Sequence, residues 1–164
     1  TGTDKMTVWA GVRKLSDAAA AIITELGPTT SAGSPGSFYL AGPDGAASNF
    51  GFGLCGTSAT FYQATGLPSP VSAVLSSSID IAGANRTDEI KPRVNAATPT
   101  VTASGTASAG TGNFGNHPLY IGRRNNASIP FNGRIYQLIV RGAASNDGQI
   151  AATEAWCNSK TRAY

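Results

Sequence analysis

The residues with the clearest chemical potential lie in "LYIGRRNNASIPFNGRIYQLIVRG", residues 119–142, where Arg123 and Arg124 are followed by Asn125 and Asn126. Guanidinium groups offer forked donors and side-chain amides offer both donor and acceptor atoms, so the cluster suits sugar hydroxyls, carboxylates or phosphates. A second interpretation needs no ligand, because consecutive asparagines tolerate the left-handed backbone of a tight turn. The sequence leaves both interpretations open, and the turn is the simpler one.

A glycine motif, "GFGLCG", places Gly51, Gly53 and Gly56 at the spacing of a dinucleotide-binding loop. That loop functions only where a strand turns into a helix. Here "TSATFYQATG" follows, which is typical of a strand, and the acid at a comparable distance, Asp80, lies inside another expected strand. Alternating glycines within a strand instead let a neighbouring loop or side chain approach closely. We therefore expect close packing at these glycines and no cofactor.

Glycoside hydrolysis requires two carboxylates on either side of the scissile bond. The nearest approach to such a pair on one strand is Asp80, which has Ser78 and Ala82 at the positions that would share its face. Asp88 and Glu89 are adjacent, so on a strand they would point to opposite faces. We predict no catalytic residues and no enzymatic activity.

The single histidine, His117 in "GNHPLY", has no Asp or Glu within ten residues. It is expected in a turn, and we predict neither a catalytic base nor a metal site from side chains. Calcium held by loop carbonyls and one aspartate, Asp44 or Asp80, would leave no signature in the sequence.

The two cysteines, Cys55 and Cys157, are too far apart in the chain for a metal-ligand pair and too few for a disulfide framework. Because cysteine often serves as a small buried apolar residue, we expect two free buried thiols. One disulfide between them is the alternative.

The charge composition argues against nucleic acid as a partner. Charged residues make up 13% of the 164 residues, and the net charge of +3 comes from 12 basic and 9 acidic side chains. Nucleic-acid binders cluster their basic residues, whereas only Arg123 and Arg124 are clustered here. No apolar run approaches the roughly 18 residues of a membrane span, so membrane insertion is not expected either.

Period-2 alternation between turn signals recurs along the chain and predicts a many-stranded antiparallel protein. The expected strands are residues 6–13, 21–26, 37–41, 49–55, 60–64, 72–81, 89–95, 98–107, 119–122 and 133–141. Pro92 lacks a ladder donor, so its strand should lie at an edge or carry a bulge. We also expect "PLYIG" and "FNGRIYQLIV" to pair, with "RRNNASIP" as the loop between them.

The segment "SNDGQIAATEAWCNSKT" departs from the β pattern and predicts a C-terminal helix over residues 147–159. Asn146 and Gln149 have the spacing of a capping box. Ile150, Glu154 and Cys157 fall on one face, and Trp156 is expected to anchor the helix to the sheet.

Four segments, in this order, resemble the laminin-G-like jelly-roll branch of the concanavalin A-like lectin/glucanase superfamily: "MTVWAGVRK", "IKPRVNA", "PLYIGRR" and "FNGRIYQLIVRGAASNDGQI". They touch both ends of the chain and span about half of it. The chain departs from the family pattern at Tyr136 and Gln137, where acids are usual, and at Ala96, where glycine is usual, so no calcium ligands are carried over. The Ala/Gly/Ser-rich style and the ending "IAATEAWCNSKTRAY" resemble domains on tail and other particle proteins of bacteriophages and prophages.

The resemblance implies an all-β, two-sheet antiparallel jelly-roll sandwich with adjacent first and last strands and a C-terminal helix. We expect residues 1–164 to form one such domain, excised from a longer chain. The expected function is non-enzymatic: attachment or assembly on a phage or prophage particle, with a host surface glycan or a neighbouring virion subunit as partner. The expected sugar contacts are Arg124, Asn125 and Asn126, with Tyr62 or Tyr120 as a stacking platform. A purely structural domain that oligomerises is the alternative, and a glycoside hydrolase is the least favoured.

Overall fold

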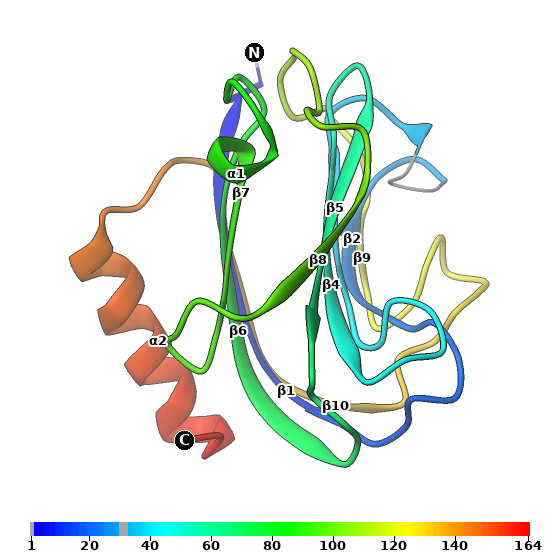
Figure 1. Ribbon diagram of the computed structural model, residues 1–164, viewed down its shortest axis with the longest axis vertical. Helices are drawn as coiled ribbons and strands as arrows, with labels where there is room; N and C mark the ends of the chain where they lie inside the picture. The colour runs from blue at the N-terminus through cyan, green and yellow to red at the C-terminus, as the bar shows by residue number, and fades with distance from the viewer. Residues whose placement is uncertain (1, 30–32) are drawn as a thin grey trace.

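The computed structural model describes residues 2–29 and 33–164, and it folds as a sandwich of two antiparallel sheets with one long helix outside them (Figure 1). The four-stranded sheet has the order β10 (Gly133–Arg141), β1 (Lys5–Lys14), β6 (Val71–Asp80), β7 (Ile90–Val94). The six-stranded sheet has the order β8 (Val101–Gly105), β5 (Ala59–Thr65), β4 (Asn49–Cys55), β3 (Ser37–Ala41), β2 (Ile22–Leu26), β9 (Leu119–Ile121). The predicted all-β sandwich class is therefore confirmed.

The core lies between the two sheets because each strand turns one set of alternate side chains inward. Val8 and Val12 of β1 meet Phe38, Phe50 and Phe52 of the opposite sheet in one continuous buried cluster. The predicted neighbourhood of the first and last strands is also confirmed, since β1 pairs with β10 along its length. Pro92 lies in β7, an edge strand, as its missing donor requires.

The expected pairing of the strands around the Arg-Asn cluster is wrong. β9 pairs with β2 in the six-stranded sheet, whereas β10 pairs with β1 in the four-stranded sheet. The connection, residues 122–132, therefore crosses from one sheet to the other. Within this connection, Arg124 and Ser128 form an isolated β-bridge around a tight turn. The turn is therefore a local feature of the connection and is not the turn of a hairpin between β9 and β10.

Helix α2 (Asp147–Thr161) covers the outer face of the four-stranded sheet, and the predicted capping box of Asn146 and Gln149 is confirmed. The expected role of Trp156 is wrong, because its side chain is 51% exposed. Glu154, Cys157 and Thr161 face the sheet instead. They recur at three- and four-residue intervals, and Trp156 falls between them on the helix surface.

A short helix, α1 (Arg86–Glu89), precedes β7 and was not anticipated; the side chain of Asn85 caps it. Among the described residues, no helix has the length and apolar character needed to cross a membrane.

Candidate functional site

No helix within the described residues packs on the outer face of the six-stranded sheet, the face turned away from the other sheet (Figure 1). This face carries a shallow cavity of about 170 Å³, lined by residues that include Tyr39, Asp44, Phe61 and Arg124. We call these four residues, together with Glu25, the outer-face site. The cavity is smaller than the ~300–1,000 Å³ of a typical drug-sized ligand pocket, so its size suits a single small unit of a ligand.

Strand register brings the site together from distant parts of the chain. Glu25 of β2 lies opposite Tyr39 of β3, Tyr39 lies opposite Gly53 of β4, and Gly53 lies opposite Phe61 of β5. Residues directly opposite one another share a face, so this row crosses four strands on the outer side. The rings of Tyr39 and Phe61 lie 5.9 Å apart, centre to centre.

The alternating glycines of β4 make room for the site. A Cβ added at Gly53 would overlap the Tyr39 ring, and one added at Gly51 would lie 2.5 Å from Asp44 Cβ. The interpretation of "GFGLCG" as a place of close approach is therefore confirmed. The tyrosine ring and the aspartate lie directly on the strand because no side chain separates them from it.

Asp44 is held by hydrogen bonds to its side chain and its backbone. Its Oδ2 accepts from the Tyr39 hydroxyl at 3.0 Å and from Gln63 Nε2 at 3.3 Å. The Asn49 side chain accepts from Asp44 N at 2.8 Å and donates to Asp44 O at 3.1 Å. Burial raises the pKa of Tyr39, and the Asp44 carboxylate raises it further. Tyr39 therefore stays protonated and remains a donor to Asp44.

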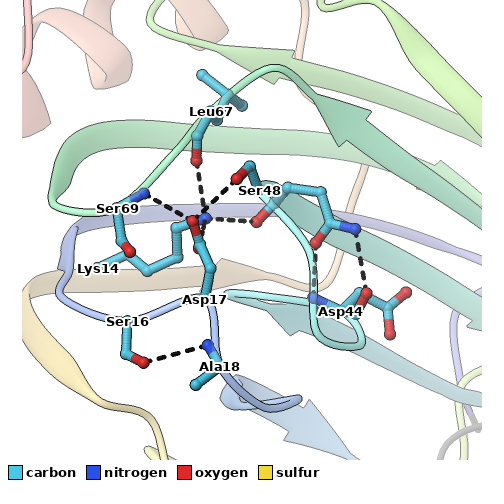
Figure 2. A network of polar contacts seen from close by, with 9 residues as sticks. Lys14, Ser16, Asp17, Ala18, Asp44, Ser48, Leu67 and Ser69 are labelled. Atoms are coloured by element: carbon cyan, nitrogen blue, oxygen red, sulfur yellow. Dashed lines mark hydrogen bonds and ion pairs between the residues drawn. The ribbon is translucent and has the colours of Figure 1, made fainter.

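A buried lysine supports this arrangement from inside the sandwich (Figure 2). Lys14 Nζ donates to Asn49 O at 2.9 Å and to Leu67 O at 2.8 Å, and it lies 2.6 Å from Asp17 Oδ1. The side chain of Lys14 is fully buried. Asn49 thus joins the lysine on one side to Asp44 on the other, which fixes the position of the carboxylate in the outer-face site.

The partner of that lysine, Asp17, is strongly hydrogen-bonded. Its Oδ2 accepts from Ser69 N at 2.7 Å and from Ser48 Oγ at 3.1 Å. Burial acts to raise the pKa of Asp17, but the hydrogen bonds from Lys14, Ser69 and Ser48 together bring it below its ordinary value. The sequence did carry a signal for this network, because Lys14 continues the inward positions of β1.

Arg124 also lines the cavity, and Glu25 holds it in place from beneath the surface. Arg124 Nε donates to both Glu25 oxygens, at 3.1 and 3.0 Å, and the Glu25 side chain is only 1% exposed. A buried carboxylate requires such a partner. The guanidinium is consequently fixed over the sheet rather than free at the surface.

The predicted asparagines lie beside this ion pair. Asn125 and Asn126 have φ angles of +45° and +53°, so the turn interpretation of this stretch is confirmed. The Tyr120 hydroxyl donates to Asn125 Oδ1 at 3.0 Å, and Tyr120 lies opposite Glu25 in the β2–β9 ladder. The structure thus gathers four of the five predicted contacts, Arg124, Asn125, Asn126 and Tyr120, at one end of the outer face.

The fifth predicted contact, Tyr62, lies elsewhere. It is opposite Phe52 on the inward face of the six-stranded sheet and packs against the core. The Arg86 guanidinium carbon lies 5.7 Å from its ring centre. Tyr62 borders a larger hollow of about 530 Å³ near β7 and β8, which we call the edge groove. It therefore cannot act together with Tyr120.

The edge groove is larger than the outer-face cavity, but two of the basic side chains that line it, Lys5 and Arg93, are already in ion pairs. Lys5 lies 2.9 Å from Asp80, and Arg93 lies 2.8 Å from Glu154. Asp80, the aspartate considered from the sequence, is therefore in a surface ion pair. The outer-face site combines aromatic rings with fixed polar groups and is the stronger candidate for binding.

The structure brings two carboxylates, Glu25 and Asp44, to the outer face from different elements. A search along single strands could not detect this pair. Glu25 is buried and bound by Arg124 through both oxygens, so it is poorly placed to transfer a proton to a ligand. Among the described residues, no group of three or more His, Cys, Asp or Glu side chains could hold a metal ion. His117 Nε2 lies 3.0 Å from Pro35 O, in a contact between loops.

Both cysteines are buried and free, as predicted. Cys55 belongs to β4 and Cys157 to α2, on separate layers of the molecule.

The sequence matches no family model and no curated protein. Solved structures are similar to it in fold. The Ruminococcus gnavus IT-sialidase CBM40 bound to α2,3-sialyllactose has a TM-score of 0.66 and 16% identity, over 93% of this chain and 83% of that one. The same CBM40 bound to α2,6-sialyllactose has a TM-score of 0.64 and 16% identity, over 93% and 84% of the two chains. These neighbours are carbohydrate-binding modules with a jelly-roll β-sandwich, so the lectin-like fold expected from the sequence is supported.

Proposed function

We propose that this domain is a non-enzymatic glycan-binding module and that the outer-face site is its binding surface. One observation carries the proposal: the half-buried Phe61 ring lines a surface cavity together with an immobilised carboxylate, Asp44, and an immobilised guanidinium, Arg124. Sugars are bound by stacking their apolar face on a ring and by hydrogen bonds from a few fixed polar groups. This site offers both.

The similar solved structures support this proposal, because they are carbohydrate-binding modules and two of them hold sialyllactose. The burial of Glu25 against Arg124 argues in the same direction. A carboxylate fixed in this way orients a binding group but does not act as an acid.

In our proposal the domain is displayed on a bacteriophage or prophage particle and contributes to attachment to a host surface glycan. The support for this context is the resemblance of the chain to domains of phage tail and particle proteins. Immunogold labelling of phage particles with an antibody raised against residues 1–164 tests the location. Absence of label from intact particles would refute it.

A glycan array with matched variants tests the binding function. Phe61→Leu removes the outward ring of β5, and Tyr62→Leu removes the neighbouring ring on the inward face. We expect at least tenfold weaker binding for Phe61→Leu and unchanged affinity for folded Tyr62→Leu. Equal losses in both variants, or no glycan bound by the wild type, would contradict the proposal.

The contribution of the asparagine turn needs a variant that keeps its backbone. Alanine would strain the left-handed conformation of Asn125 and Asn126, whereas glycine adopts it freely. We expect Asn125→Gly and Asn126→Gly to weaken glycan binding while the melting temperature stays within a few degrees of the wild type. Unaltered binding in both would remove these residues from the site.

A structural role as an oligomerising domain is the second candidate, and one observation favours it. β9 and β10 are edge strands of their sheets, and Leu119 and Ile121 of β9 and Val140 of β10 are 42%, 57% and 37% exposed. Exposed apolar edge strands promote association. Light scattering after size-exclusion chromatography separates the candidates: a stable oligomer that binds no glycan favours the structural role.

A further inference from the structure

The outer-face site contains two carboxylates and one guanidinium, so it carries a net negative charge. This charge restricts which sugars the site can bind. Arg124 is the single cation among the five site residues, and its Nε is bound to both oxygens of Glu25. Glu25 is buried, so this pair is screened little by solvent and its two charges largely cancel. Asp44 then adds one further negative charge to the same cavity.

Among the residues that the structure describes, no cation forms an ion pair with Asp44. Its Oδ2 is bound by two neutral donors, the Tyr39 hydroxyl and the Gln63 amide. Its backbone is bound by the neutral side chain of Asn49. Lys14 contacts Asn49 rather than Asp44, and its charge is paired with Asp17. Neutral donors fix a carboxylate without cancelling its charge.

The second oxygen of this carboxylate is available to a ligand. Within residues 2–29 and 33–164, no group donates a hydrogen bond to Asp44 Oδ1, and the two Nη groups of Arg124 bind no acceptor. The site therefore presents one negatively charged acceptor and a planar pair of donors beside the Phe61 ring. Hydroxyl groups satisfy both, because each hydroxyl can donate and accept.

An anionic sugar, by contrast, would be repelled at this site. Its carboxylate or sulfate would find Arg124 already neutralised by Glu25 and would lie close to Asp44. Juxtaposed like charges in a contact surface cost several kcal/mol. The nearest further cation, Arg123, is exposed and bound to the carbonyl of Asn126 at 3.4 Å, where solvent screens it.

We infer that the outer-face site binds a neutral, hydroxyl-rich sugar unit and discriminates against carboxylated or sulfated ones, with Asp44 as the residue that determines this specificity. The inference rests on the glycan-binding function proposed above. It goes beyond that function because the similar solved structures were determined with sialylated sugars, whereas the charges of this site favour the uncharged members of the same class.

Matched ligand pairs test the inference. Residues 1–164 are screened on an array that carries each neutral glycan beside its sialylated or sulfated derivative, and hits are measured by titration calorimetry; lactose and sialyllactose form one such pair. We expect at least tenfold tighter binding of the neutral member. In Asp44→Asn, which keeps the size of the side chain and one oxygen that can accept from Tyr39 and Gln63 but removes the negative charge, this preference should shrink to threefold or less.

Asp88→Asn serves as the charge control, because Asp88 borders the edge groove and its removal changes the net charge equally. The preference should be unchanged in that variant, and raising the salt concentration should narrow it in the wild type. Tighter binding of acidic glycans, or an equal change in both variants, would overturn the inference and leave the glycan-binding function intact. If no glycan of either kind binds, the proposed function fails and the inference fails with it.

Discussion

Two buried glutamates in this molecule carry out similar electrostatic tasks on opposite sides of the sandwich. Glu25 binds Arg124 at 3.0 Å on the outer face of the six-stranded sheet, and Glu154 binds Arg93 at 2.8 Å beneath α2 on the four-stranded sheet. Each glutamate side chain is 1% exposed, and the arginines are 23% and 33% exposed. The pairs are therefore closely matched in geometry and burial.

Their surroundings differ. The carboxylate of Glu154 also accepts from Ser76 Oγ at 2.6 Å, so it joins the helix to β6 and β7. In the described part of the chain no helix covers the Glu25–Arg124 pair, and Arg124 lines a surface cavity with Phe61 and Asp44. The Glu154–Arg93 pair therefore joins the helix to the sheet, whereas the Glu25–Arg124 pair presents a guanidinium to the solvent. A buried ion pair alone therefore does not indicate a binding site; the open space and the additional polar groups beside it do.

Lys14 is a cation that, unlike the two arginines, is fully buried, and its removal should have the largest effect on stability. Lys14→Met leaves the carbonyls of Asn49 and Leu67 without their donor and Asp17 without its cation. Removal of one partner of a buried ion pair costs about 3–5 kcal/mol. We expect a loss of that order in the free energy of unfolding, measured by urea denaturation.

Lys5→Met is the matched control, because Lys5 forms ion pairs with Asp4 and Asp80 in which every side chain is more than 30% exposed. Exposed pairs contribute about 0–1 kcal/mol. Similar losses in the Lys5 and Lys14 variants would show that burial does not determine the strength of these pairs.

Removal of the two arginines tests the comparison directly and is expected to have the second-largest effect. Arg93→Met and Arg124→Met each withdraw the cation from a buried carboxylate, which costs about 2–3 kcal/mol for a charged hydrogen-bonded group. Both variants should lose stability by similar amounts in urea denaturation. Only Arg124→Met should also weaken glycan binding, measured without urea at a temperature at which both variants remain folded. A loss of affinity in Arg93→Met would mean that the covered pair is coupled to the binding surface.

Sequence periodicity predicted the strands because each of them has one inward face. Periodicity also indicates which face a side chain occupies, which is why Gly51 and Gly53 could be interpreted as points of close approach. It does not indicate which strands are neighbours. The two runs around Arg124 alternate equally well, yet they belong to different sheets, since β9 pairs with β2 and β10 with β1.

The site was only partly predictable for the same reason. Arg124 and the asparagines were visible because they are adjacent in the sequence. Glu25 lies 99 positions from Arg124. Asp44 lies in the loop between β3 and β4, and its hydrogen bond to Tyr39 forms only once that loop has folded. Tyr62 was selected for its residue type, and the register then turned it inward, opposite Phe52. Chemistry assembled from distant segments becomes visible only with the pairing of the strands.

The smallest expected effect concerns the covered side and is a pH dependence. Burial, together with a smaller contribution from the nearby Glu154 carboxylate, raises the pKa of the Cys157 thiol from 9.0 to about 11. Between pH 9 and 11 the unfolded chain loses this proton while the folded chain keeps it, so the folded state binds more protons and stability falls as pH rises. The expected loss from this group is about 1.4 kcal/mol at pH 10 relative to pH 8. Cys157→Ala should be less stable at pH 8, because it loses buried volume, but its stability should fall less steeply with pH by that amount. Urea denaturation of both proteins at pH 8 and 10 measures the difference, and parallel pH profiles would show that the thiol beneath α2 is accessible to solvent rather than sealed with Glu154.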